Sequence, residues 1–143
     1  MRRADIVAAA ESWLGTPYQH QASRKGAGTD CLGLLRGVWR EVCGAEPQPV
    51  PPYTPDWAEA LADDLLMASA RQHLNETAPG HAREGDVLLF RMRLGVPAKH
   101  CAILVAPERI IHAYWGRSVC MTRLVPWWSR RVAGAFSFPG LED

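Results

Sequence analysis

The chain has 143 residues, of which 48% are hydrophobic and 22% are charged, and its formal net charge at pH 7 is +1. This length suits a single domain, residues 1–143, with one substantial core. Because the charge is nearly balanced and no basic-aromatic stripe occurs, we expect no nucleic-acid partner. No apolar run approaches the roughly 20 residues of a membrane span, so we expect no membrane insertion. The sequence has no Walker loop or dinucleotide fingerprint, and we expect no cofactor.

The start of the chain imitates a secretion signal only briefly. Met1-Arg2-Arg3 precedes an alanine-rich stretch, but Asp5 and Glu11 interrupt the apolar region. We therefore expect that the chain has no secretion signal and is synthesised in the cytoplasm. The cysteines show no CxxC pair and are too sparse for a disulfide scaffold, so reduced thiols are expected. They are Cys31, Cys43, Cys101 and Cys120.

Two helices are predicted near the N-terminus. The first spans residues 4–14 and is followed by Gly15 and Pro17, which end a helix. Its apolar face contains Ile6, Ala9, Ala10, Trp13 and Leu14. Residues 16–28 are expected to form a loop, polar and glycine-rich at its end. The second helix begins at Cys31 and ends near Gly44.

A proline-rich connector follows at residues 47–55, in which Val50 and Tyr53 can pack. Asp56 can then cap a third helix over residues 57–74. The buried side of this helix is expected to contain Trp57, Leu61, Leu65 and Ala68. Residues 75–83 are expected to be loop.

The second half of the chain changes to a strand-like pattern. The candidate strands are Val87–Met92, His100–Val105, Arg109–Trp115, Val119–Leu124 and Val132–Phe138. A short turn or helical piece is expected at residues 126–131. Short connections imply antiparallel neighbours, as in a meander. The order of elements predicts an α+β fold, with N-terminal helices packed on an antiparallel sheet of about five strands.

The segment Thr29-Asp30-Cys31-Leu32-Gly33-Leu34 is the first candidate site. Thr29 or Asp30 can act as the N-cap residue, which places Cys31 in the first turn of an amphipathic helix. The helix dipole there favours a thiolate, whose pKa can fall from about 8.5 toward roughly 3.5–7.5. The negative charge of Asp30 acts in the opposite direction unless its carboxylate is used in capping. This pattern does not distinguish a nucleophile from a buried thiol.

Two of the five histidines, His100 and His112, lie in predicted strands. If the hairpin between them has an odd-length loop centred on Ala106, both side chains lie on the same face of the sheet. Cys101 then points to the opposite face, as a core thiol. A histidine beside a helix-start cysteine can act as its general base, and a second polar group can orient that base. His20, His73 and His81 receive no role.

A zinc site is an alternative use of the same residues. Cys31, His100 and His112 have the chemistry of three zinc ligands that leave a fourth position for water. However, the sequence contains no closely spaced ligand pair such as HExxH or CxxC to support it. We therefore expect no metal.

Several motifs together resemble the NlpC/P60 family of papain-like cell-wall cysteine peptidases, over about residues 4–138. The motifs are Gly15-Thr16-Pro17-Tyr18, Thr29-Asp30-Cys31-Leu32-Gly33-Leu34, Glu84-Gly85-Asp86-Val87, Lys99-His100-Cys101-Ala102-Ile103 and Ile110-Ile111-His112-Ala113. The resemblance implies a papain-like fold, with Cys31 as nucleophile, His100 as base and His112 as the orienting residue. It also implies that Tyr18 helps to bind the oxyanion beside the Cys31 backbone N–H. The implied substrate is a peptidoglycan stem peptide, cut between D-Glu and a diamino acid.

One departure from the family pattern points to a branch of it. Leu32 stands where the family usually has serine. In this feature, in its short length and in its Pro-Pro-Tyr-Thr-Pro-Asp-Trp connector, the chain resembles the branch of the family that is encoded with phage tails and gene transfer agents. The resemblance implies incorporation into a phage-like particle, with tail-tip or baseplate partners and action in the periplasm or cell wall. Two alternatives remain open. The chain could be a non-catalytic plug in a tail tip, or a thiol acyltransferase.

Overall fold

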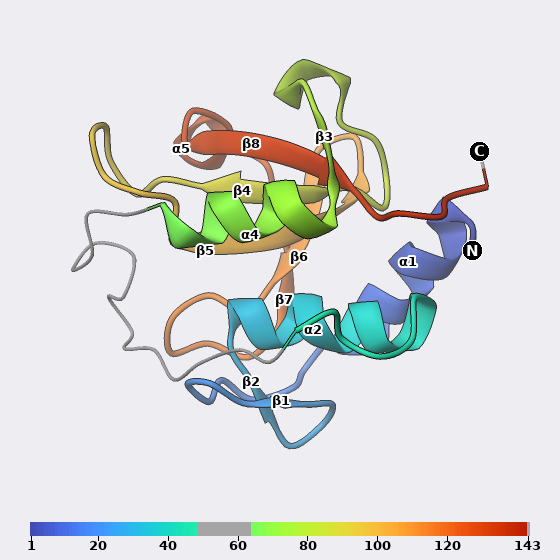
Figure 1. Cartoon of the computed structure of the whole chain (residues 1–143). Coiled ribbons are helices and arrows are strands. Elements are labelled where there is room, and N and C mark those ends of the chain that lie inside the picture. The colour runs from blue at the N-terminus through green and yellow to red at the C-terminus, as the bar shows by residue number, and fades with distance from the viewer. Residues whose placement is uncertain (49–63, 143) are drawn as a thin grey trace.

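A computed structural model describes residues 1–48 and 64–142. Helices α1 (Arg3–Glu11) and α2 (Cys31–Val42) come first, and α4 (Leu65–His73) follows (Figure 1). The remaining elements include a 3-10 helix, η1 (Pro79–His81), and a short helix, α5 (Pro126–Ser129). The main sheet has six strands: β3 (Asn75–Thr77), β4 (Val87–Phe90), β5 (His100–Ala106), β6 (Arg109–His112), β7 (Cys120–Arg123) and β8 (Val132–Ser137). The α+β fold class and the two N-terminal helices are therefore confirmed.

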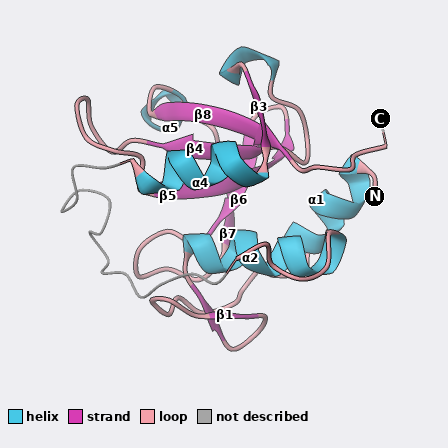
Figure 2. Cartoon of the chain, viewed as in Figure 1, coloured by secondary structure: helices cyan, strands magenta, loops and turns pink. Residues whose placement is uncertain are grey.

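The strand order is β3-β8-β4-β5-β6-β7, and all the neighbouring strands are antiparallel. The strands β4 to β7 form the expected meander, but β8 does not pair with β7. It crosses the sheet and pairs with β4 and β3 (Figure 2). The expected sequential pairing is wrong here because α5 carries the chain over the sheet, where its Trp128 is buried.

The sheet has a core on each face. On one face, side chains of α1, α2 and α4 pack against residues such as Leu89, Cys101 and Ile103. On the other face, Trp128 packs with Leu88, Phe90, Ala102, Leu104, Ile110 and Ala135. Alternation along β5 therefore sends Cys101 to the helix side and its neighbour Ala102 to the α5 side. This confirms the core position predicted for Cys101.

Helix α2 packs unusually closely against the segments that precede it. A Cβ atom at Gly33 would overlap the Ala22 carbonyl and the Thr29 hydroxyl. A Cβ atom at Gly37 would overlap the ring of Trp13. Both positions therefore need glycine, which explains two glycines on the packed side of an otherwise regular amphipathic helix. The close packing fixes the start of α2 against the chain before it.

Several sequence predictions need correction. The first helix ends at Glu11 rather than residue 14, and Leu14 is exposed. A two-stranded ribbon, β1 (Ser23–Arg24) and β2 (Gly28–Thr29), lies in the predicted loop. The predicted loop at 75–83 contains the edge strand β3, which has little apolar character because its side chains are mostly exposed.

The helix predicted over 57–74 is described only from residue 64. Here α4 begins at Leu65, and its buried residues are Leu66, Met67 and Ala70. Leu65 and Ala68 are exposed, so their predicted burial is wrong. The residues Leu66, Met67 and Ala70 instead share one face of the helix, and this face packs into the core. Trp57 and Leu61, and Val50 and Tyr53 of the connector, lie outside the described residues.

Within the described part of the chain, every helix is too short or too polar to cross a membrane. The two ends of the described chain lie close together in Figure 1, where the Glu142 N–H donates to the Met1 carbonyl at 2.9 Å.

Candidate active site

The carboxylate of Asp30 caps the start of α2. Its Oδ1 accepts a hydrogen bond from the Gly33 N–H at 2.7 Å, and its Oδ2 accepts one from the Gln21 N–H at 2.8 Å. The residue is only 3% exposed, so both bonds are shielded from water. Asp30, rather than Thr29, is thus the N-cap residue, and Cys31 is the first residue of the helix. The predicted placement of Cys31 in the first turn is confirmed.

The beginning of β5 surrounds Cys31. The Cys31 thiol lies 4.0 Å from the Lys99 carbonyl oxygen, and the Cys101 thiol donates to the Cys31 carbonyl at 3.3 Å. His100 lies between these two residues in sequence and interacts with the sulfur of Cys31. Lys99, just before β5, and the first two residues of β5 therefore all interact with the first residue of α2.

This environment favours the thiolate form of Cys31. The pKa of its thiol is held well below the ordinary value, first by the hydrogen bond with Cys101 and then by a hydrogen bond and positive charge from His100. Burial and the negative charge of Asp30 act in the opposite direction. The pKa of the Cys101 thiol is raised well above its ordinary value by the same contact with Cys31 and by burial. Of the two thiols, Cys31 is the one that ionises first.

The rings of His100 and His112 are directly bonded. His100 Nε2 lies 2.9 Å from His112 Nδ1, and both residues are buried. Their strands are joined by a two-residue turn between Ala106 and Arg109, with a β-bulge between Leu104 and Ala106. Beyond the bulge Ile103 pairs with Ile111, so the two histidines are diagonal neighbours rather than opposite residues. The shared face is confirmed, although the predicted loop centred on Ala106 is not what produces it.

Thr122 holds the far side of the second histidine. His112 Nε2 lies 2.9 Å from Thr122 Oγ1. Burial first, and then the charge of His100, lower the pKa of His112 to about 3. His112 is therefore neutral at pH 7. We assign its proton to Nε2, which donates to Thr122, so that Nδ1 can accept from the His100 N–H.

Aromatic side chains exclude water from the histidine pair. The ring of Trp128 lies 5.5 Å from that of His100 and 5.0 Å, edge to face, from that of His112. Phe90 and Tyr114 also pack against His100, with ring centroids at 5.8 and 5.5 Å. This surrounding explains the strong desolvation of His112. It also fixes the His100 ring, whose Nδ1 is left for the sulfur because Nε2 contacts His112.

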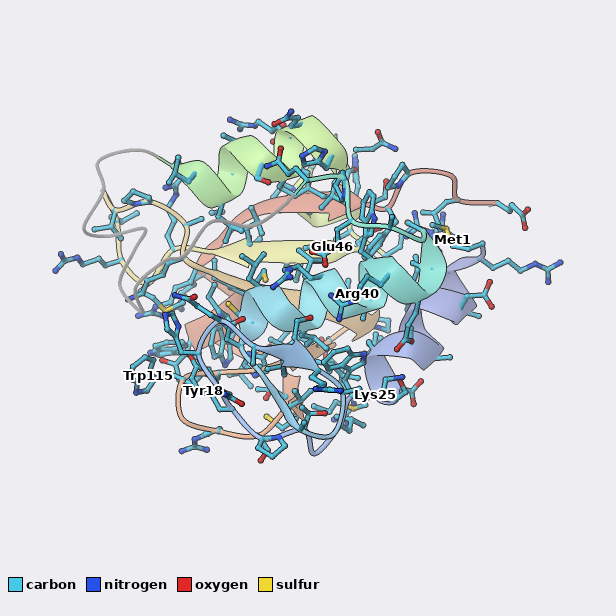
Figure 3. All side chains as sticks on the ribbon, turned by 60° about the horizontal axis from the view of Figure 1, so that its bottom comes forward. Met1, Tyr18, Lys25, Arg40, Glu46 and Trp115 are labelled. Atoms are coloured by element: carbon cyan, nitrogen blue, oxygen red, sulfur yellow. The ribbon has the colours of Figure 1, made fainter. Side chains whose placement is uncertain are left out.

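Tyr18 lies beside the start of α2 because its loop pairs with the segment before Cys31. Tyr18 forms an isolated bridge with Thr29, and the Gln19 N–H donates to the Thr29 carbonyl at 3.0 Å. Burial, and then the charges of Cys31 and Asp30, raise the pKa of Tyr18 to about 12. Its hydroxyl therefore stays protonated and can donate a hydrogen bond. Figure 3 shows Tyr18 next to Trp115, with ring centroids 5.8 Å apart.

A pocket of about 250 Å³ opens over these residues. The residues that line it include Tyr18, Cys31, Met92, Lys99, His100 and Trp115. Trp115 is 62% exposed and forms part of the pocket wall. His112 does not line the pocket and lies behind His100. The pocket thus presents a thiol, an imidazole and a phenolic hydroxyl to a ligand.

The structure brings together all four site residues expected from the sequence: Cys31, His100, His112 and Tyr18. It adds Thr122 and Cys101, neither of which carries a functional signal in the sequence. Alternation along β7 could have placed Thr122 beside a histidine only if the strand register had been known. Among the residues that the structure describes, no cluster of three or more metal-ligating side chains occurs. Both ring nitrogens of His112 already have partners, which does not fit the zinc alternative.

Comparison with known proteins agrees with this arrangement. The model of the NlpC/P60 family matches residues 15–136. A curated relative, the gamma-DL-glutamyl hydrolase of Bacillus subtilis, is 26% identical over 140 residues, which is 95% of this chain. The chain spans only 29% of the length of that relative.

Solved structures of the same family are also similar. The NlpC/p60 domain of the peptidoglycan hydrolase SagA has a TM-score of 0.66 and 27% identity, over 96% of this chain and 100% of that domain. An NlpC/P60 family protein from Bacillus cereus has a TM-score of 0.70 and 20% identity, over 96% of this chain and 40% of that one. These neighbours share the papain-like NlpC/P60 fold, with helices against an antiparallel sheet. With most of its length matched by the family model, this chain belongs to the NlpC/P60 family.

Proposed function

We propose that the protein is a cysteine peptidase that cleaves peptidoglycan stem peptides by a Cys-His-His mechanism. The observation that carries this proposal is the continuous contact from Cys31 through His100 and His112 to Thr122, at the wall of an open pocket. Two members have the protonation state that such a mechanism needs. Cys31 ionises readily, and His112 is neutral, so that its Nδ1 can accept a hydrogen bond from His100 Nε2–H.

In the first half of the reaction, the Cys31 thiolate attacks the carbonyl carbon of the scissile amide. The new S–C bond pushes the carbonyl electron pair onto oxygen, and the oxyanion accepts hydrogen bonds from the Cys31 backbone N–H and the Tyr18 hydroxyl. The first backbone N–H groups of a helix lack an intrahelical acceptor, so they suit this role. The C–N bond then breaks as His100 gives its proton to the leaving amine. The product of this half is a thioester on Cys31.

In the second half, water enters the pocket and His100 takes a proton from it. The hydroxyl adds to the thioester carbonyl, the C–S bond breaks, and the sulfur leaves as a thiolate. The acyl group departs as a carboxylic acid, and His100 is again protonated. His112, held by Thr122, keeps the His100 ring in place throughout because its Nδ1 accepts the Nε2–H.

The names of two relatives support the substrate class. SagA is a peptidoglycan hydrolase, and the Bacillus subtilis relative is a gamma-DL-glutamyl hydrolase. We propose that the scissile bond joins the side-chain carbonyl of D-Glu to a diamino acid. To test this, the purified protein is incubated with a defined muropeptide that contains this bond, and the products are measured by mass spectrometry. Cleavage at the D-Glu bond, abolished in Cys31→Ala and retained in Cys43→Ala, is expected.

The same experiment distinguishes the peptidase from the two alternative functions, a non-catalytic plug and an acyltransferase. Complete absence of products from folded wild-type protein would favour the non-catalytic plug. Products that carry an added amine instead of water, when an amine is supplied at high concentration, would favour the acyltransferase.

We further propose that a phage-like tail delivers the protein to the periplasm or cell wall, with tail-tip or baseplate proteins as its partners. Leu32 in place of the family serine and the proline-rich sequence after Glu46 support this branch of the family. Attachment to a particle raises the effective concentration of a tethered enzyme at the wall. Particles carrying Cys31→Ser should assemble but fail to deliver their contents through intact walls. Normal delivery by the mutant particles would show that catalysis is dispensable. If the mutant particles do not assemble, the soluble muropeptide assay described above decides whether the protein is an enzyme.

A further inference from the structure

The side of Cys31 away from His100 is occupied by a second thiol. His100 and Cys101 are consecutive residues of β5, so their side chains point to opposite faces of the sheet. His100 joins His112 on the α5 face, whereas Cys101 lies in the core shared with α2. Both nevertheless reach Cys31, because the first residue of α2 lies at the end of β5. The nucleophile candidate is therefore contacted from two faces of one strand.

Cys101 is placed to be a hydrogen-bond donor only. It is 1% exposed, and its contact with Cys31, its burial and the charges of Cys31 and Asp30 keep its thiol protonated. Its single S–H donates to the Cys31 carbonyl oxygen, from which its Sγ lies 3.3 Å away. This bond fixes the first residue of α2 against the start of β5, where His100 interacts with the Cys31 sulfur and favours its charged form.

We propose that Cys101 is a positioning residue: its buried thiol, bonded to the Cys31 carbonyl, holds the first turn of α2 so that the Cys31 sulfur stays beside His100. This inference rests on the proposed role of Cys31 as nucleophile. It assigns the second thiol a part in the chemistry that simple core packing does not require. A similarly sized apolar side chain would fill the same space but could not donate.

Other ionisable groups also face Cys31, and they must be kept constant in any test. They come from the loop before α2, from the N-cap residue and from the start of β5: Tyr18, His20, Asp30, Lys99 and His100. Asp30 opposes ionisation of Cys31, and His100 favours it. None of these residues is altered by a substitution at Cys101, so the change in Cys31 can be attributed to the donor.

The test measures the rate of Cys31 alkylation by iodoacetamide against pH, with mass spectrometry to quantify the Cys31 peptide alone. In Cys101→Ala the midpoint of the profile should rise by about one pH unit, because the Cys31 sulfur is then held less firmly beside His100. In Cys101→Ser, where a hydroxyl replaces the thiol, the midpoint should stay at or below the wild-type value. Cys43→Ala is the matched control, because Cys43 is at the other end of α2, and its midpoint should equal that of wild type.

An unchanged midpoint in folded Cys101→Ala would overturn the proposal. So would a midpoint in Cys101→Ser that is raised as far as in Cys101→Ala, since packing alone would then explain the effect. If Cys101→Ala does not fold, the nearly isosteric Cys101→Ser decides: a midpoint above the wild-type value overturns the proposal. These readouts need no substrate, so they stand even if the protein cleaves no muropeptide, and failure of the proposed function can be recognised separately.

Discussion

His100 Nε2 and His112 Nδ1 lie 2.9 Å apart although the two residues are not opposite one another in the sheet. The two-residue turn alone would pair the strands so that the histidines faced opposite sides. The β-bulge between Leu104 and Ala106 shifts the register by one residue and returns His112 to the face of His100. The bond between the two rings therefore depends on one extra residue in β5.

The first prediction concerns Thr122, which contacts the side of the His112 ring away from His100. Thr122→Val removes the hydroxyl that faces His112 Nε2 but keeps the side-chain shape. We expect kcat for muropeptide cleavage to fall about fivefold, the equivalent of one neutral hydrogen bond of ~1 kcal/mol, with KM unchanged. Thr122→Ser should retain the wild-type kcat. Equal losses in the valine and serine variants would show that the methyl group, rather than the hydroxyl, matters.

The second prediction concerns stability against pH. The pKa of His112 is about 3 in the folded protein but about 6.5 in the unfolded chain, so the unfolded state binds the additional proton as the pH falls below 6.5. The part of the free energy of unfolding that comes from keeping His112 neutral is fully present above pH 6.5, and it is lost progressively as the pH falls toward 3. Between pH 7 and pH 5, urea unfolding should show wild type losing about 2 kcal/mol more than His112→Gln.

The control for this measurement is His81→Gln, since His81 is exposed on η1. This variant should follow wild type between the two pH values. Parallel pH curves for wild type and His112→Gln would mean that His112 is not held neutral by the fold.

Asp30 has two opposing effects, and the third prediction separates them. Asp30→Asn keeps one acceptor oxygen but cannot accept from both the Gly33 and the Gln21 N–H groups. The free energy of unfolding should fall by roughly 1–2 kcal/mol. The pKa of Cys31 should nevertheless move further down, because the negative charge that raises it is gone. An alkylation midpoint that moves up instead would contradict this reading of the charge.

The fourth prediction tests the oxyanion donor. Tyr18→Phe removes only the hydroxyl and leaves the ring against Trp115. The loss of one oxyanion donor should lower kcat by about 100-fold, with little change in KM. Since the pKa of Tyr18 is about 12, wild-type activity should show no decline between pH 8 and pH 10 that Tyr18→Phe lacks. A decline of that kind, or an unchanged kcat in Tyr18→Phe, would exclude the hydroxyl as donor.

Local patterns in the sequence account for much of the candidate site. The cap and the apolar stripe place Cys31 in the first turn of α2, and strand alternation places Cys101 in the core. Contacts made across the fold could not be predicted in this way. The bulge in β5 and the partnership of Thr122 with His112 depend on register, which period-2 patterns leave open.

The edges of the sheet were also hard to predict from sequence. Strand β3 is mostly exposed and is held to β8 by backbone pairing, so it lacks the apolar alternation that marks a strand. The crossing of β8 to β4 goes with the packing of Trp128 against the sheet face opposite α1, α2 and α4, a long-range contact that a run of short connections does not reveal.

The most direct test of the account is to observe the covalent intermediate on Cys31. Wild-type protein is mixed with the defined muropeptide, quenched in acid within milliseconds to seconds, and mapped by mass spectrometry. A thioester mechanism on Cys31 predicts a transient mass increase on the Cys31 peptide that equals the acyl part of the substrate, and no increase on Cys43, Cys101 or Cys120. The adduct should be absent from Cys31→Ser and from His100→Ala. Muropeptide cleavage that continues in Cys31→Ala, or an adduct on another cysteine, would contradict it.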